Sequence, residues 1–588
     1  MFEKEQAALE QAIRDFCTKS EIPEPDLNWK PIPFAGHWGI SISFFRTAAS
    51  IKNHETNISV ADRAQAMAAK IAEGIILPSG FDRIEAVRGY LNIYFSTTEF
   101  AARVLDTILN ENESYGRSPR RNEQVMVEFS QPNTHKAFHV GHLRSAILGD
   151  VISRMMDAAG YDVIRANYPG DIGLHVMKWL WNYMKFHRGE KPAEEITRWM
   201  GDLYKEAVDR LEKEPDLEME VRELYTRWDR RDDEVVALWK ETREWSLEGF
   251  HQIYGMLDIP FDIYYFPSDV EKAGQAVVED LISKGIATDE RAQGEAVVVK
   301  LDDLLGNSQE KYRVLVILRS DGTALYATED LALAIRKFGD YPELKRSLYV
   351  VDVRQSLHFT QLFKTLELAG YPWAKQCEHI PYELVNLPGN VVMASREGTV
   401  VLLEDLIKEA TNRAMAVVEE KNPELPEDQK KEISRAVAIG AVKYTMLSRE
   451  NTKVVTFDWE AALDFNGQAA PFIQYAHVRA CSILRNAGTL PQMVELGNLE
   501  LTKAEVDLID NLSRFPEVVR SAADQHKPLD LTNYAFNLAS SFHGFLAQCR
   551  VLQAEEPNRS LRIRLVAAVR QTLANSLGLM GITAPEAM

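Results

Sequence analysis

A nearly continuous apolar run at Val125–Phe129, followed by a polar turn and a helical pattern, limits the possible folds of this chain more than any other feature. One carboxylate, Glu128, interrupts the run, which is typical of a strand that helices cover on both faces. Apolar residues recur with a helical period from Leu143 to Gly160, and residues 161–168 resemble a second strand. The segment therefore predicts a strand–helix–strand unit, whose ligands lie at the carboxyl ends of its strands.

Two histidines stand at the start of the predicted helix. His139 and His142 fall three residues apart on one face, where free backbone amides and the helix dipole favour a phosphate. Gly141 allows a flat ring to approach the backbone closely, and Lys136 adds a positive charge just upstream. Each imidazole can donate a hydrogen bond to phosphate oxygens as pyrophosphate is displaced. The alternatives are two helix-capping histidines or half of a metal site, and zinc is disfavoured because no cysteine pair lies nearby.

The string His139-Val-Gly-His142 resembles the HIGH motif of class I aminoacyl-tRNA synthetases. The preceding string Ser130-Gln-Pro-Asn133, together with Lys136, narrows the resemblance to the arginyl-tRNA synthetases. The resemblance implies that ATP binds at Ser130, His139, Gly141, His142, Met393 and Ser395.

Further segments carry the residues that this resemblance assigns to arginine. Tyr326 and Asp330 are four residues apart, a spacing that places both side chains on one face of a helix that begins there. Gln355 follows an apolar strand. A planar guanidinium with five donors favours carboxylates in bidentate geometry, for which Glu128 and Asp330 are the best candidates, while Asn133 and Gln355 suit the amino and carboxylate ends. The alternatives are a paired structural carboxylate, a core aromatic and a helix cap, respectively, for Glu128, Tyr326 and Asp330.

The second class I signature, the KMSK loop, is altered in this chain, which reads Val392-Met393-Ala-Ser395-Arg396. Val392 replaces the first lysine, and Ser395 or Arg396 occupies the closing basic position. Arginyl enzymes that lack this lysine typically carry one just upstream of the HIGH motif, where Lys136 stands. The resemblance therefore implies that Lys136 and Arg396 act with the two histidines on the departing pyrophosphate.

Candidate tRNA contacts lie toward both ends of the chain. The predicted strand 89–96 belongs to a segment that resembles the extra amino-terminal domain of arginyl synthetases, which touches the tRNA elbow. Residues 465–479 resemble the helical anticodon domain of the family, with side chains suited to splayed bases, although a buried helix junction is an equal alternative. The resemblance implies tRNA contacts at Asn92, Gln474, Tyr475, Arg479 and Met588.

The predicted fold class is α/β, in three parts. An α+β domain over residues 1–118 precedes a Rossmann-type parallel-sheet catalytic domain over 119–403, with a helical insertion at about 179–257, and an α-helical bundle follows over 404–588. Five tryptophans in the insertion suit either RNA stacking or packing between helices, and the amphipathic pattern favours packing. They are Trp181, Trp199, Trp228, Trp239 and Trp245.

Composition fits a large cytoplasmic enzyme. The 588 residues are too many for one core, and the four scattered cysteines are consistent with a reducing compartment. No early apolar run resembles a signal peptide, and no uncharged stretch is long enough to cross a membrane. The net charge of −20 does not exclude RNA binding, because net charge governs solubility more than the field at a local groove.

The resemblance implies an arginine–tRNA ligase that uses ATP and Mg²⁺ to form arginyl-adenylate, and then transfers arginine to the 3′ end of arginine-specific tRNA. It also implies a monomer. Two other classes remain open. Another class I synthetase or a small-molecule nucleotidyltransferase would share the histidine motif, and a catalytically silent tRNA-binding paralogue would keep the RNA domains. Arginine-dependent turnover separates the three.

Overall fold

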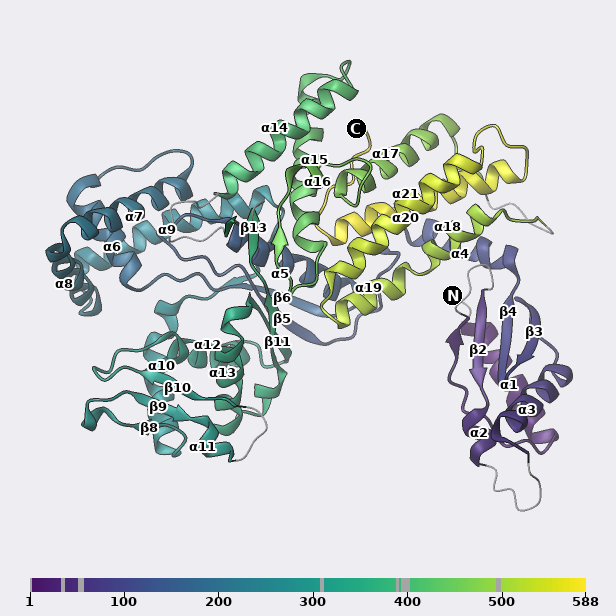
Figure 1. The fold of residues 1–588 in the computed structure, drawn as a ribbon, viewed down its shortest axis with the longest axis horizontal. Helices are drawn as coiled ribbons and strands as arrows, with labels where there is room; N and C mark the ends of the chain where they lie inside the picture. The colour runs from purple at the N-terminus through teal and green to yellow at the C-terminus, as the bar shows by residue number, and fades with distance from the viewer. Residues whose placement is uncertain are drawn as a thin grey trace.

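The computed structural model describes residues 3–32, 38–50, 58–306, 311–387, 391–392, 402–492 and 499–588. Over these ranges the chain forms a central α/β domain, a small α+β domain at the amino-terminal end and a bundle of helices at the carboxy-terminal end (Figure 1). This architecture confirms the predicted fold class.

A five-stranded parallel sheet forms the centre of the molecule. In sheet order, its strands are β12 (Cys377–Tyr382), β11 (Leu344–Asp352), β5 (Gln124–Glu128), β6 (Asp162–Asn167) and β7 (Ile263–Tyr264). The chain passes from β5 to β6 on one side, while β11 lies on the other side of β5. The order of strands therefore reverses beside β5, and the carboxyl ends of β5 and β11 border the crevice in which such sheets bind ligands.

Helix α5 (Val140–Ala158) connects β5 to β6, as the sequence predicts. It approaches the chain after β5 so closely that a Cβ atom added to Gly149 would lie 2.1 Å from the ring of Phe129. Only glycine fits there. Beyond the sheet, α5 also packs against α15 and α19 of the helical bundle, so it is a core element of both parts of the molecule.

Two insertions extend the central domain. The first consists of α6 (Leu174–Asn182), α7 (Ile196–Lys213), α8 (Glu218–Asp229) and α9 (Asp233–Met256). Its tryptophans are buried or packed against a common core, which confirms the prediction that they are packing residues. The second insertion consists of α10 (Pro267–Ser283), β8 (Thr288–Asp289), β9 (Val297–Lys300), α11 (Leu301–Leu305), β10 (Val314–Leu318) and α12 (Tyr326–Asp340). Helix α13 (Ser356–Leu368), which connects β11 to β12, packs on the same core.

The amino-terminal domain is a four-stranded antiparallel sheet with helices. Its elements are α1 (Glu3–Lys19), β1 (Lys30–Pro31), β2 (Gly39–Ser43), α2 (Phe45–Ser50), α3 (Val60–Gly74), β3 (Phe81–Val87) and β4 (Tyr90–Phe95), and α4 (Thr97–Glu111) leads onward. The Tyr115 hydroxyl donates a 2.7 Å hydrogen bond to the Leu512 carbonyl oxygen, and Asp106 forms an ion pair with Arg564. The segment after this domain is therefore docked on the carboxy-terminal bundle.

The carboxy-terminal part is helical. Its helices are α14 (Leu403–Lys421), α15 (Glu427–Leu447), α16 (Trp459–Ala462), α17 (Ala470–Ala487), α18 (Lys503–Ser513), α19 (Phe515–Asp524), α20 (Pro528–Gln548) and α21 (Asn558–Leu579). The break between α14 and α15 spans Pro423 and Pro426, where the sequence predicts it. A small sheet of β13 (Val385–Leu387), β14 (Val391–Val392) and β15 (Val455–Thr456) lies between this part and the central domain.

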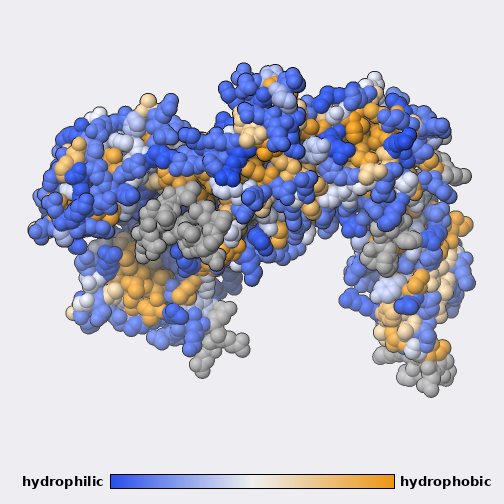
Figure 2. Space-filling model, turned by 45° about the horizontal axis from the view of Figure 1, so that its top comes forward, coloured by the Kyte–Doolittle hydropathy of each residue, from blue (hydrophilic) through white to orange (hydrophobic). Residues whose placement is uncertain are grey.

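The surface viewed in Figure 2 is mostly hydrophilic, with hydrophobic residues gathered over the lower-left domain and over the helical bundle at upper right. In the described parts of the chain, every helix is too short or too polar to cross a membrane.

Candidate active site

The two histidines of the H-x-G-H string lie at the first turn of α5. His139 is the N-cap residue, and its Nδ1 accepts a hydrogen bond from the Gly141 amide at 3.1 Å. The Nδ1 of His142 accepts one from the His139 amide at 3.4 Å. The two rings stack, with their centroids 3.8 Å apart and their planes 20° apart. The amides that begin the helix therefore hold both rings in a fixed orientation.

Both imidazoles are neutral near pH 7. Burial, assisted by the charge of Lys136, lowers the pKa of His139 to about 4. Burial, assisted by His139 and Lys136, holds the pKa of His142 well below its ordinary value. A neutral imidazole has one donor and one acceptor nitrogen, and each Nδ1 here is an acceptor. Each ring therefore carries its proton on Nε2, which is left to donate to a phosphate oxygen.

Lys136 lies in the loop between β5 and α5. Its Nζ is 4.8 Å from the centroid of the Tyr204 ring on α7, and within the described ranges it forms no ion pair. Burial lowers its pKa. The charge of this ammonium is close enough to lower the pKa values of both histidines. The structure thus brings together the predicted phosphate-binding residues Lys136, His139, Gly141 and His142.

Glu128 is buried at the carboxyl end of β5. Its Oε2 forms an ion pair with Lys337 of α12, and its Oε1 accepts a 3.2 Å hydrogen bond from the Gln131 side chain. The Lys337 Nζ also lies 4.0 Å from the centroid of the Tyr349 ring, and Tyr349 faces Glu128 in the register of β11. Part of this carboxylate therefore has a structural partner, which leaves Oε1 as the oxygen with capacity for a ligand.

The other residues predicted to bind arginine lie on three elements around the crevice. Tyr326 is the first residue of α12 and Asp330 lies one turn later on the same face, as their spacing predicts, and the Asp330 carboxylate lies 2.7 Å from His358 Nε2 of α13. Gln355 is exposed at the end of a short 3-10 helix that follows β11. Asn133 forms a bridge with the chain that follows β6. These positions lie beside the carboxyl ends of β5, β6 and β11.

Three further carboxylates, which no sequence motif marks, lie near Asp330. Glu329 precedes it on α12, Glu271 is on α10, and Asp171 follows β6. Burial, and then the charges of Asp330, Glu271 and Asp171, raise the pKa of Glu329 to about 8. The Tyr168 hydroxyl is buried without a hydrogen-bond partner among the described residues, and its pKa is raised by burial and by Asp330 and Glu329. The crevice is therefore strongly acidic and contains an unsatisfied hydroxyl.

A buried arginine on α5 joins the start of this helix to a neighbouring loop. The Arg144 guanidinium donates to the carbonyl oxygens of Glu383 and Leu384, just before β13, and to those of Asn451 and Lys453. Sequence reasoning missed Arg144, because a lone arginine inside an apolar helix pattern carries no motif.

The altered KMSK segment is attached to α5 at both described ends. Met393, Ser395 and Arg396 lie outside the described residues. Upstream, the Arg144 clamp holds the chain that enters β13. Downstream, Leu402 forms a bridge with His139, and the Leu403 amide donates a 3.3 Å hydrogen bond to the Phe138 carbonyl oxygen. Both stems therefore meet the helix that carries the histidines.

Ser130 has a different environment from the one expected of an ATP ligand. It is fully buried, its amide donates to Ser145 Oγ at 3.0 Å, and its hydroxyl lies 3.0 Å from the Tyr254 hydroxyl. The side chain is thus occupied in the interior. Its role in this structure is to fix the turn after β5.

Of the predicted anticodon contacts, Tyr475 and Arg479 lie on one face of α17. Tyr475 is 41% exposed and stacks on His543 with ring centroids 5.9 Å apart. Arg479 Nη1 lies 3.1 Å from His543 Nδ1. An exposed aromatic ring beside a guanidinium suits contact with a splayed base.

Gln474 is fully buried, in contrast to its predicted role at an RNA surface. Its Nε2 donates to the carbonyl oxygens of Ala436 at 3.3 Å and Thr583 at 2.9 Å. His477 Nδ1 donates to the Pro585 carbonyl oxygen at 2.8 Å. These bonds fasten the carboxy-terminal tail to α17, which is the buried helix junction that the sequence left as the alternative. Met588, at the end of this tail, packs against the core.

Asn92 lies far along the chain from these residues, on β4 of the amino-terminal domain. Its side-chain Oδ1 accepts a 2.6 Å hydrogen bond from Ser41 on β2. The side chain is partly exposed.

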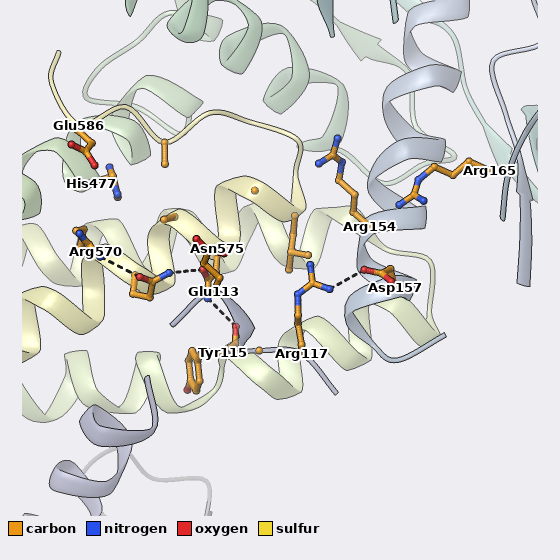
Figure 3. A pocket seen from close by; sticks show the side chains of 16 residues that line it. Glu113, Tyr115, Arg117, Arg154, Asp157, Arg165, His477, Arg570, Asn575 and Glu586 are labelled. Atoms are coloured by element: carbon orange, nitrogen blue, oxygen red, sulfur yellow. Dashed lines mark hydrogen bonds and ion pairs between the residues drawn. The ribbon is translucent and has the colours of Figure 1, made fainter. Parts of the chain in front are cut away.

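A cavity of about 540 Å³ lies at the other end of α5 (Figure 3). It is bordered by α5, α17, α21, the segment 113–117 and the carboxy-terminal tail, and the Arg117–Asp157 ion pair of 2.8 Å spans one edge. Arg154 follows His139 by 15 residues, which corresponds to roughly 22 Å along a helix. The cavity therefore belongs to the junction of the domains and not to the histidine site.

Comparisons with known proteins agree with this geometry. Residues 104–459 match the family model for the catalytic domain of class I (R) tRNA synthetases, and residues 473–588 match the model for the DALR anticodon-binding domain. The chain is 35% identical over 516 residues to the arginine–tRNA ligase of Clostridium acetobutylicum, covering 87% of this chain and 88% of the relative. It is 36% identical over 511 residues to that of Bdellovibrio bacteriovorus, covering 85% and 86%. The structure of the Thermus thermophilus arginyl-tRNA synthetase is similar at a TM-score of 0.78 and 29% identity, covering 99% of this chain and 100% of that one.

Proposed function

Because this chain belongs to the class I arginyl-tRNA synthetases and is an arginine–tRNA ligase, we propose that it activates L-arginine at the crossing from β5 to α5. The observation that carries the proposal is the pair of neutral, stacked imidazoles of His139 and His142 at a helix amino terminus. Their Nε2–H groups and the helix dipole are suited to the α-phosphate of ATP, where negative charge increases as the arginine carboxylate attacks.

Arginine is proposed to lie in the acidic crevice. Asp330 and the Oε1 atom of Glu128, which also accepts a hydrogen bond from Gln131, supply carboxylate oxygens, and Tyr326 aligns the side chain. Asn133 and Gln355 are proposed to hold the amino and carboxylate ends of the substrate. Lysine cannot make the planar set of hydrogen bonds, and citrulline lacks the charge, so both would leave buried acceptors without partners.

Lys136 and Arg396 are proposed to share the stabilisation of the departing pyrophosphate, with Met393 and Ser395 contacting ATP. Support comes from Lys136, whose ammonium is close to both histidines and has no ion-pair partner within the described residues. Mg²⁺ is proposed to enter with ATP. No group of three His, Cys, Asp or Glu residues in the described ranges is suited to hold a metal, so the phosphates would supply most of its ligands and the ion would neutralise their charge.

Transfer is proposed to occur to the 2′-hydroxyl of the terminal adenosine of tRNA. The exposed Tyr475 and Arg479, with Met588, are proposed to receive the anticodon, and Asn92 the tRNA elbow. The bonds of Gln474 to the tail favour an indirect role for this residue.

The domain limits near residues 118 and 403 remain predictions, and the match to the catalytic-domain model continues to residue 459. We propose a cytoplasmic location, which the four free cysteines support. A monomer is also proposed, and light scattering at micromolar concentration tests it.

The first test is arginine-dependent exchange of pyrophosphate into ATP, with and without arginine-specific tRNA. Exchange that needs both arginine and tRNA would support the proposed order, in which tRNA binds before activation. Exchange without tRNA would contradict that order and keep the site. No exchange under either condition would contradict the proposed activation site.

A further inference from the structure

Glu329 is a buried carboxylate in the first turn of α12, with 8% of its surface exposed. Within the described parts of the chain, its side chain forms neither an ion pair nor a hydrogen bond. The neighbouring carboxylates all have cationic or imidazole partners: Asp330 pairs with His358, Asp171 with Arg243, and Glu271 with Arg231. Burial of an unpaired carboxylate is unfavourable, so its retention at this place calls for a ligand.

The groups that face Glu329 come from four elements. Asp330 shares its helix, Glu271 faces it from α10, and Asp171 faces it from the loop after β6. Two phenols lie within range of its charge, Tyr168 after β6 and Tyr225 on α8, and Arg319 lies near Tyr225 and Tyr326. Like charge therefore predominates around Glu329, and together with burial it raises the pKa of this group to about 8.

The same region contains a buried hydroxyl group without a hydrogen-bond partner among the described residues. The Tyr168 hydroxyl is buried and unpartnered among the described residues, and its nearest charges include Asp330 and Glu329. A ligand with positive charge and several N–H donors would satisfy this hydroxyl and the unpaired carboxyl together. A guanidinium has one delocalised charge and five such donors, whereas an ammonium has three donors at one point.

We propose that Glu329 is a further carboxylate for the guanidinium of arginine, in addition to Asp330 and Glu128, and that it releases its proton to solvent when the substrate binds. The inference rests on the proposed binding of arginine at Asp330. It makes Glu329 a determinant of substrate specificity, since the full negative charge develops only when a cation fills the crevice.

Proton release on binding makes the KM for arginine depend on pH in a definite direction. In the free enzyme Glu329 is protonated below pH 8, while in the complex it is ionised, so lowering the pH weakens arginine binding. For a free-enzyme pKa of about 8, the KM for arginine should rise about fivefold from pH 8 to pH 7. Above pH 9 it should become nearly constant until the substrate itself titrates.

The experiment measures the KM for arginine between pH 6.5 and pH 9 in the exchange assay, with saturating ATP and tRNA. Wild type should show the rise at low pH. Glu329→Gln resembles the protonated form, so its KM should be independent of pH over this range and about tenfold above wild type at pH 9. Asp340→Asn, which removes a carboxylate at the far end of the same helix, should follow wild type.

A Glu329→Gln enzyme that keeps the wild-type KM and its pH profile would overturn the proposal. Circular dichroism and thermal unfolding check that the variant is folded. Asp330→Asn distinguishes a failure of the role of Glu329 from a failure of the proposed arginine site. If it raises the KM while Glu329→Gln does not, only the role of Glu329 fails. If neither variant changes the KM, the proposed arginine site fails as well.

Discussion

Lys337 and Glu128 form an ion pair in the interior, where their side chains are 0% and 4% exposed. The pair joins α12 to the end of β5, two segments 209 residues apart in sequence. Because Tyr326 and Asp330 begin the same α12, the pair also fixes the position of these residues relative to the histidines. Two charges that have lost most of their water depend on each other strongly.

Lys337→Met should therefore lower the free energy of unfolding by about 3–5 kcal/mol, the usual loss when one partner of a buried pair is removed. Urea denaturation measures it. Adding Glu128→Gln should restore part of the loss, because the uncompensated charge disappears. Lys345→Met, at an exposed lysine of β11, is the matched control. A loss below about 1 kcal/mol would mean that the pair is not a major contributor to stability.

Lys136→Ala should lower the rate of adenylate formation at least roughly tenfold, since a cation near the departing pyrophosphate is lost. Single-turnover measurements with saturating arginine, ATP and tRNA report this step. Lys205→Ala, an exposed lysine next to Tyr204 on α7, should leave it unchanged. Near-normal adenylate formation in Lys136→Ala would refute the idea that this lysine replaces the one absent at Val392.

The pair of neutral histidines predicts acid sensitivity. His139 and His142 have folded-state pKa values below the ordinary value of 6.5, so the unfolded chain binds more protons than the folded chain as the pH falls below that value. The contribution of the neutral His139 to the free energy of unfolding is present above about pH 6.5 and is lost as the pH approaches 4. From pH 7 to pH 5, the loss should be roughly 1–2 kcal/mol for His139, and His142 should act in the same direction.

Chemical denaturation at the two pH values tests this expectation. His139→Gln should show a smaller difference between pH 7 and pH 5 than wild type. The exposed His251→Gln should show the wild-type difference. An unchanged difference in His139→Gln would show that this histidine does not contribute to acid destabilisation.

Gln474→Ala and Tyr475→Ala should separate structural from direct effects at the anticodon domain. Gln474→Ala removes the donor to the Thr583 carbonyl oxygen and an additional donor to that of Ala436, so it should cost about 1–3 kcal/mol of stability and also raise the KM for tRNA as the tail loosens. Tyr475→Ala should raise the KM for tRNA with little change in stability. If Tyr475→Ala lowered stability and Gln474→Ala raised only the KM for tRNA, Gln474 would contact the RNA and Tyr475 would be structural. Thermal unfolding and aminoacylation kinetics together decide.

Local patterns were sufficient to predict much of the fold. The apolar run before the histidines became β5, the periodic segment after them became α5, and the four-residue spacing of Tyr326 and Asp330 placed them one turn apart at the start of α12. Each of these features depends on neighbours in sequence, which is the information that periodicity contains.

Pairings between segments that are distant in the chain could not be predicted from the sequence. Lys337 meets Glu128, and Arg144 meets four carbonyl oxygens, only because the sheet and the helices bring them together. Glu271 and Asp171 join the acidic crevice in the same way. For Gln474, residue type alone suited both an RNA surface and a buried junction, and burial decided for the junction.

The way in which the altered KMSK loop is attached to α5 affects which substitutions the loop can tolerate. Arg144 holds the segment that enters the loop, and Phe138 and His139 hold the segment that leaves it. Both ends of the loop are therefore attached at the start of α5. On the side of the loop, the groups that are held are backbone carbonyls and an amide, which no change of side chain inside the loop removes. Substitutions within residues 393–401 should therefore leave both attachments to α5 in place.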